Sequence, residues 1–219
     1  MSLTEVVAAL HKDVAELQRF VADRFWEVEQ AHRRNGKGVI QRSGEFSSSS
    51  RIQWVYVVVV SPSKTTLYPM GWYFTRQGIH AFQIDAEGPA TYLRPHVLER
   101  YRQRFHPHDD VLNALRHMHV RNYDKAVEYR EYKGRPAIAS AVEDGYFLGE
   151  MCFNGALVDV HTFYDVAMGA REPALREMRK LLEWRRYFTA TRQNPVRAGS
   201  YMSWGLGFTT RLERLHRAA

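Results

Sequence analysis

Hydrophobic residues recur at three- and four-residue spacing over residues 3–32, a pattern typical of one long amphipathic helix. The apolar face of this segment consists of Val6, Val7, Leu10, Val14, Leu17, Val21, Phe25 and Val28. Asn35-Gly36 then supplies residues that commonly end a helix. Because the polar face carries no recognisable chemistry, we expect this N-terminal helix, residues 1–34, to pack on the core or to join copies of the chain in a homo-oligomer.

A first β region, residues 37–85, follows this helix. Its segments 39–46, 52–60, 71–76 and 79–84 are rich in β-branched and aromatic residues. Stretches that contain serine, proline or glycine separate the segments. The region therefore predicts successive antiparallel strands.

The next part of the chain, residues 93–190, mixes helical and strand patterns. Helices are expected at residues 95–105, 111–122 and 173–188, and strands at 137–142, 146–153 and 156–164. Pro95 suits the first turn of a helix, and Asp109 or Asp110 can cap the next one. A basic tail, residues 191–219, closes the chain.

Together these patterns predict a single α+β domain over residues 1–219, with antiparallel sheet, flanking helices and the long N-terminal helix. The helix-plus-sheet part at 93–190 is where we expect a catalytic site, for the reasons that follow.

The strongest turn signal is Asn154-Gly155, because both central residues of a type I′ turn need positive φ. A two-residue turn sets the pairing of the flanking strands and places Glu150 directly opposite Asp159. Like charges so placed repel each other. The pair is therefore expected to need a cation, an arginine or a shared proton.

The same pairing puts His161 opposite Leu148 and on the face of Asp159. Thr162 falls on the opposite face, which is the more apolar and is expected to meet the core.

Three arrangements would accommodate the charges of this hairpin. A metal could be held by Glu150, Asp159 and His161, since two carboxylates and an imidazole suit Mn, Fe or Zn. An arginine bridge from Arg100 or Arg104 could join the hairpin to the helix at 95–105. Alternatively, the charges could be solvated on an exposed edge strand.

The helix at 95–105 has one apolar and one basic side. Steps of 100° per residue place Val97, Leu98, Tyr101 and Phe105 on the apolar side. His96 and Arg100 project from the opposite side, with Arg104 at its margin. Because a helix N-terminus favours an anion such as phosphate, this segment can present a base beside a phosphate clamp; the alternative is a solvated basic face.

The net charge of the chain indicates a class of binding partner. Lysine and arginine total 31 against 24 aspartate and glutamate residues, giving a net charge of +7 and a pI near 9.6. This balance attracts polyanions, and nucleic acid is the expected partner. A second basic surface is expected on the helix at 173–188, through Arg176, Arg179, Lys180 and Arg186, beside an apolar stripe that packs on the core.

The remaining chemistry is sparse. Cys152 is the only cysteine, which excludes an intrachain disulfide and fits a reducing compartment. No secretory signal and no apolar run of about 20 residues is found, so we expect a cytoplasmic protein that does not insert into membranes. No phosphate-binding, dinucleotide-binding or nucleophile-elbow motif occurs, so no cofactor is expected. The clusters His106/His108 and His117/His119 lack zinc-site spacing, and we assign no metal to them.

Three short motifs resemble those of a known group of proteins. They are His-Val-Leu-Glu-Arg-Tyr-Arg-Gln-Arg at 96–104, Asp-Gly-Tyr-Phe-Leu-Gly at 144–149 and Val-His-Thr-Phe at 160–163. Together they resemble bacterial and phage proteins of the barnase, EndoU, colicin and RelE-like nuclease superfamily, over about residues 93–165. The resemblance implies a helix with His and Arg beside a small antiparallel sheet, and metal-independent cleavage of RNA by attack of the ribose 2′-hydroxyl.

Site roles follow from this resemblance. It implies that His96 is the acid or base, that Arg100 or Arg104 binds the phosphate, and that His161 or Thr162 is a partner on the sheet. RNA becomes the favoured nucleic acid.

We therefore expect a ribonuclease-like enzyme in which Glu150 and Asp159 orient or neutralise the basic groups. Three alternatives stay open: a nucleic-acid-binding module without catalysis, a metal-dependent hydrolase that uses Glu150, Asp159 and His161, and an assembly protein that oligomerises through its N-terminal helix.

Overall fold

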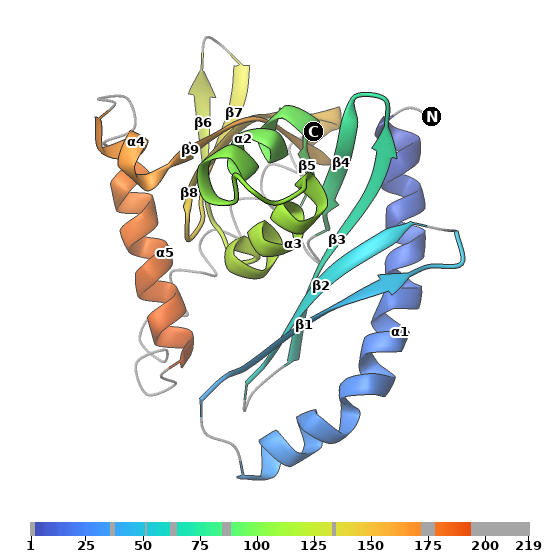
Figure 1. The fold of residues 1–219 in the computed structure, drawn as a ribbon. Coiled ribbons are helices and arrows are strands. Elements are labelled where there is room, and N and C mark those ends of the chain that lie inside the picture. Colours follow the sequence, from blue (N-terminus) through green and yellow to red (C-terminus); the bar gives the residue numbers. More distant parts are fainter. Residues whose placement is uncertain are drawn as a thin grey trace.

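The structure is a computed structural model that describes residues 3–35, 38–50, 52–61, 65–84, 89–132, 135–171 and 178–193. The strands of these residues form one nine-stranded sheet in the order β1-β2-β3-β4-β5-β9-β8-β7-β6. Helices flank the sheet, and α1 is the long N-terminal helix (Figure 1). The predicted α+β fold is confirmed, and its sheet is mixed and mostly antiparallel.

The helices are α1 (Leu3–Asn35), α2 (Pro95–Phe105), α3 (Val111–Asn122), α4 (Val166–Arg171) and α5 (Met178–Gln193). The strands are β1 (Ile40–Ser47), β2 (Gln53–Val60), β3 (Thr65–Thr75), β4 (Gly78–Gln83), β5 (Ala90–Leu93), β6 (Ala126–Tyr132), β7 (Arg135–Ala141), β8 (Gly145–Cys152) and β9 (Leu157–Asp165).

The predicted helices at 95–105 and 111–122 are confirmed as α2 and α3, and Asp110 caps α3 through a bond from the backbone N–H of Asn113. The start of the helix predicted at 173 and all but the first three residues of the tail lie outside the described residues; α5 begins at Met178 within them. The predicted strands are all present, whereas β5 and β6 were missed. β5 has four residues and β6 mixes charged with aromatic residues, so neither shows a strand pattern of useful length.

Two antiparallel groups of strands meet at β5. Strands β1 to β4 form one group and β6 to β9 the other. β5 pairs antiparallel with β4 but parallel with β9, and this is the one parallel pair among the described strands. A parallel pair needs a long crossover, which here includes α2, α3 and β6 to β8.

The two faces of the sheet carry different helices (Figure 1). On one face, α2 and α3 bury Val97, Leu98, Tyr101, Leu115 and Met118 against the sheet. The other face has α1 over the β2 to β5 half and α5 over the β7 to β8 half. These two helices lie on the same face of the sheet. Tyr146, Leu148 and Cys152 point to one side of β8, and the first two pack with α5 residues while Cys152 packs with the cluster that contains α1.

The predicted core packing of α1 is confirmed by its buried apolar residues. A polar anchor sets its position: the Asp13 carboxylate accepts hydrogen bonds from Ser50 Oγ at 2.7 Å and from the indole Nε1 of Trp54 at 3.0 Å. The serine run therefore forms the β1–β2 loop, as predicted, and also docks the helix. Oligomerisation through α1 stays a prediction.

A buried carboxylate holds α2 and α3 to the sheet. Asp144, in the β7–β8 turn, accepts bonds from Tyr101 Oη (2.7 Å), Arg121 Nη2 (2.7 Å) and Asn122 Nδ2 (2.9 Å). Its side chain is only 3% exposed. Burial alone would raise the pKa of Asp144, but the bonds from Arg121, Tyr101 and Asn122 outweigh burial and lower the pKa below 3.8.

We expect Asp144→Asn to lower the free energy of unfolding by about 2 kcal/mol at pH 7, because it removes a charged acceptor from buried donors. The lowered pKa means that the carboxylate stabilises the fold above its ordinary pKa of 3.8, and that this contribution is lost as the pH falls through the folded-state pKa. Urea unfolding of the variant and the unmodified chain should therefore differ most at neutral pH and converge in acid. Asp23→Asn, at an exposed position of α1, is the control; an equal effect of both substitutions at pH 7 would contradict the role of Asp144.

Candidate functional site

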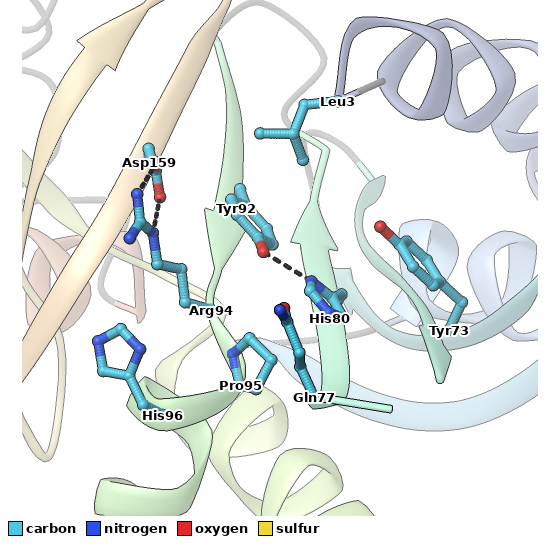
Figure 2. Close-up of a pocket in the computed structure, with 9 residues that line it drawn as sticks. All are labelled: Leu3, Tyr73, Gln77, His80, Tyr92, Arg94, Pro95, His96 and Asp159. Atoms are coloured by element: carbon cyan, nitrogen blue, oxygen red, sulfur yellow. Dashed lines mark hydrogen bonds and ion pairs between the residues drawn. The ribbon is translucent and has the colours of Figure 1, made fainter. Parts of the chain in front are cut away.

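A pocket of about 540 Å³ lies at the carboxyl end of β5, where the chain enters α2. The residues that line it are Leu3, Tyr73, Gln77, His80, Tyr92, Arg94, Pro95, His96 and Asp159 (Figure 2). They come from the start of α1, from β3, β4, β5 and β9, from the first turn of α2, and from the β3–β4 turn and the β5–α2 junction. The pocket thus lies on the α1 face of the sheet and combines an aromatic wall with polar groups.

The end of β5 explains why α2 is basic. β5 pairs with β9 as far as Leu93 and Val160, so the following residues of β9 have no strand on that side. Carbonyl groups of alternate strand residues point to the same side and need hydrogen-bond donors. His96 Nε2–H donates to the carbonyl oxygen of His161 and Arg104 Nη1 to that of Phe163, both at 2.6 Å. α2 therefore takes the place of the missing strand.

Arg100 adds a third contact between α2 and β9, through a 2.6 Å bond from its Nη1 to Thr162 Oγ1. The structure thus brings His96, Arg100 and Arg104 of α2 against the part of β9 that carries His161 and Thr162, and of these five residues His96 alone lines the pocket. The bonds from His96 and Arg104 go to backbone carbonyl groups and so complete the edge of β9, whereas Arg100 bonds to the Thr162 side chain.

The hairpin register was predicted correctly near its turn and wrongly beyond it. Asn154 and Gly155 both have positive φ, and Ala156 N–H donates to the Phe153 carbonyl, as in a type I′ turn. Glu150 lies opposite Asp159, which confirms that part of the register.

A β-bulge then inserts His161 as an extra residue of β9. Leu148 pairs with Thr162 rather than with His161, and Gly149 pairs with Val160. A bulge turns later side chains to the opposite face, so Thr162 leaves the apolar face where we expected it, and Phe163 enters the core instead. Gly149 permits this irregularity, because a Cβ there would overlap the carbonyl oxygen of Asp159.

The charge on Asp159 is matched by an arginine, but not by one of the two predicted. Arg94 donates from Nε (2.8 Å) and Nη2 (2.6 Å) to the two oxygens of the Asp159 carboxylate, whereas Arg100 and Arg104 bond to other groups. The Asp159 side chain is 9% exposed and that of Arg94 is 41% exposed. The hydrogen bonds to Asp159 raise the pKa of Arg94, so the guanidinium stays charged at the pocket.

His161 lies near this ion pair. Its Nε2 is 3.6 Å from Asp159 Oδ2 and 3.5 Å from Arg94 Nη2. Within the described residues, three metal-ligating groups do not converge at Glu150, Asp159 and His161; they converge at His106, Asp109 and His117. The arginine bridge is therefore the arrangement that the structure favours for the hairpin.

The opposite wall of the pocket is a row of rings on neighbouring strands. His80 lies nearly parallel to Tyr73 and to Tyr92, with centroids 5.2 and 5.8 Å away. His80 Nδ1 is hydrogen-bonded to Tyr92 Oη at 2.6 Å (Figure 2). Its Nε2 is hydrogen-bonded to Thr75 Oγ1 at 2.9 Å. Burial lowers the pKa of His80 and raises that of Tyr92 to about 12. Both rings are thus neutral at pH 7.

The second predicted basic surface is only partly described. Arg179, Lys180 and Arg186 are exposed on α5, while Arg176 lies outside the described residues. Arg185 of the same helix is buried and forms an ion pair with Glu143. None of the three exposed residues lines the pocket, so nucleic-acid binding by α5 stays a separate prediction.

Sequence reasoning missed most of the pocket. Arg94 occupies the N-cap position of α2, outside the helical turns whose faces periodicity can assign. Tyr73, His80 and Tyr92 occupy strand positions where an aromatic residue normally means core packing. One signal was available: Gln77-Gly78 separates two strands already predicted, and antiparallel pairing across that turn places Tyr73 opposite His80 and so on the same face.

We expect a double-mutant cycle with Arg94→Gln and Asp159→Asn to give a coupling energy of about 1 kcal/mol in unfolding free energy, a value reduced by the solvent exposure of Arg94. The control cycle pairs Arg94→Gln with Glu150→Gln, since Glu150 lies opposite Asp159 without a bond to Arg94. Coupling of equal size in both cycles, or none in the first, would show that the ion pair is not formed in solution.

No protein-family model, no curated protein and no solved structure matches this chain. The resemblance to the nuclease superfamily therefore stays a prediction.

Proposed function

We propose that the pocket binds a nucleotide of single-stranded RNA and cleaves its 3′ phosphodiester without a metal ion. The observation that supports this most is the meeting of an oriented imidazole, a guanidinium and a protonated phenol, from His96, Arg94 and Tyr92, in one pocket beside a helix start. The net charge of +7 favours a polyanionic ligand.

His96 is the proposed general base. Its Nε2 bonds to a carbonyl oxygen, which can only accept, so Nε2 carries the hydrogen. In the neutral ring the lone pair is then on Nδ1, which is free to take a proton. The resemblance assigns this residue the same kind of role.

The phosphate is proposed to lie at the start of α2, against the guanidinium of Arg94. The positive end of the helix dipole favours an anion there, and Pro95 at the first helical position shapes the chain's entry. Arg94 uses Nε and Nη2 for Asp159, which leaves Nη1 for the phosphate. Arg94 thus replaces Arg100 and Arg104 as the proposed phosphate clamp, while those two hold α2 on β9.

Tyr92 is the proposed acid. When Thr75 Oγ1–H donates to His80 Nε2, His80 Nδ1–H donates to Tyr92 and the phenol hydrogen is left for the ligand. Its pKa of about 12 keeps the phenol protonated, yet is low enough to protonate an alkoxide.

The proposed reaction is an internal transfer of the phosphoryl group. The ribose 2′-hydroxyl gives its proton to His96 Nδ1 while its oxygen attacks phosphorus, and the bond from phosphorus to the 5′ oxygen of the next nucleotide breaks. That oxygen takes the proton of Tyr92. The products are a 2′,3′-cyclic phosphate and a free 5′-hydroxyl, and proton exchange with water restores both side chains.

Binding without cleavage is the second candidate, and a specific observation favours it. Arg94, His80 and His96 already make hydrogen bonds within the chain. These bonds fix the orientation of the three side chains, which is sufficient for recognising a ligand without any proton transfer. In that case a nucleotide would bind in a salt-dependent manner and remain intact.

We expect His96→Gln to reduce cleavage of a single-stranded RNA in excess EDTA by at least about 100-fold, the usual contribution of a general base. The glutamine amide can still donate to the His161 carbonyl, so the stability of the chain should hardly change. Tyr92→Phe should show a similar loss of rate. His11→Ala, at an exposed position of α1, is the control and should cleave normally.

The products decide between the two candidates. Cyclic phosphate ends that disappear in the His96 and Tyr92 variants support catalysis. Intact RNA with a bound nucleoside 3′-phosphate, measured by calorimetry and weakened by Arg94→Gln, supports the binding module instead. Cleavage that persists equally in both variants would contradict the proposed site.

A further inference from the structure

Three side chains with metal-binding atoms converge at the connection between α2 and α3. His106 follows the last residue of α2, Asp109 lies in the turn, and His117 comes from α3. Their ligand atoms all lie within 4.8 Å of one another. The sequence separates them into two clusters with no zinc-site spacing, so only the fold brings the two imidazoles and the carboxylate together.

The geometry of this His/Asp cluster is compact. His106 Nδ1 is 3.1 Å from Asp109 Oδ2. The rings of His106 and His117 are nearly parallel, with an interplanar angle of 15° and centroids 4.6 Å apart. The two rings are therefore stacked, and His106 already directs its Nδ1 at the Asp109 carboxylate, with a ligand nitrogen of His117 within 4.8 Å.

The turn that carries two of the ligands is held independently of them. Arg102 Nη1 donates to the carbonyl oxygens of Pro107 (3.1 Å) and Asp109 (3.2 Å), and Asp109 N–H donates to the His106 carbonyl at 3.0 Å. The charge of Arg102 is matched by Glu99, through bonds of 2.6 and 2.9 Å. The backbone is thus set before any ligand binds, which lowers the cost of ordering the site.

The third ligand remains adjustable. His117 is exposed, so its ring can rotate with little resistance. Ligands about 2.1 Å from a tetrahedral zinc ion lie about 3.4 Å from one another. The observed spread of up to 4.8 Å therefore needs to shrink by little more than 1 Å, which side-chain rotation can supply.

We propose that His106, Asp109 and His117 bind one Zn²⁺ or a chemically similar divalent transition-metal ion. Two imidazole nitrogens and one carboxylate oxygen suit zinc and its neighbours, whereas magnesium and calcium prefer oxygen alone. Water fills the remaining position, because the site opens to solvent at His117. Neighbouring groups are otherwise engaged: Asp110 caps α3 and so supplies no ligand.

The site is separate from the pocket, because the two lie at opposite ends of α2. It is also independent of the proposed RNA cleavage, which needs no metal. Its failure and the failure of that proposal can therefore be told apart.

Titration of the full chain, without an affinity tag and after removal of bound metals, with ZnCl₂ in a calorimeter tests the proposal. We expect one high-affinity ion per chain, together with a rise in the melting temperature, since the ion binds the folded state. His117→Ala and Asp109→Asn should each weaken binding by about tenfold or more. His108→Ala is the matched control, because His108 lies in the same turn, is exposed and is not part of the cluster.

Two results would overturn the proposal: no saturable binding by the unmodified chain, or binding that His106→Ala and His117→Ala leave unchanged. The second would place the ion among the other histidines. Each variant's melting temperature without metal confirms that it folds, and because His117 is exposed its loss should leave the fold intact.

Discussion

The early end of β5 is the constraint on which the rest of this structure depends. The strand stops at Leu93, while its neighbour β9 continues to Asp165. A strand cannot leave its carbonyl groups without hydrogen-bond donors in the interior of a sheet. Here α2 starts directly after β5, and its His96 and Arg104 side chains donate hydrogen bonds to the carbonyl oxygens of β9. The same step creates the pocket, because a helix start then faces the space above the end of the strand.

This constraint also explains which arginine neutralises the hairpin. Arg94 lies at the junction itself, two residues after Tyr92, which pairs with Asp159, and it reaches both oxygens of the Asp159 carboxylate. Arg100 and Arg104 lie farther along the helix and meet the bulged part of β9. A bidentate pair gains more than a single contact does, which favours Arg94 as the partner of a carboxylate that is largely removed from water.

Local patterns predicted α2, α3, the serine loop and the Asn154-Gly155 turn, because each depends on neighbours in the sequence. The opposed carboxylates of Glu150 and Asp159 followed from the turn alone. The prediction failed at His161, since a bulge depends on close packing at Gly149 and leaves no periodic signal. β5 was missed for a related reason: four residues held mainly by their neighbours have no pattern of their own. The pocket needed β5, and so it could not be assembled from the sequence.

α2 joins two chemically different sites. Its first turn faces the pocket, and its last residue precedes the histidine of the His/Asp cluster. Asp144 fixes the helix between them, through Tyr101 of α2 and through Arg121 and Asn122 of α3. Because this buried clamp already holds both helices on the sheet, an ion at the cluster would tie together elements whose relative position is set. Its effect would therefore fall on the stability of the α2–α3 corner, and the geometry of Arg94 and His96 at the pocket would stay the same.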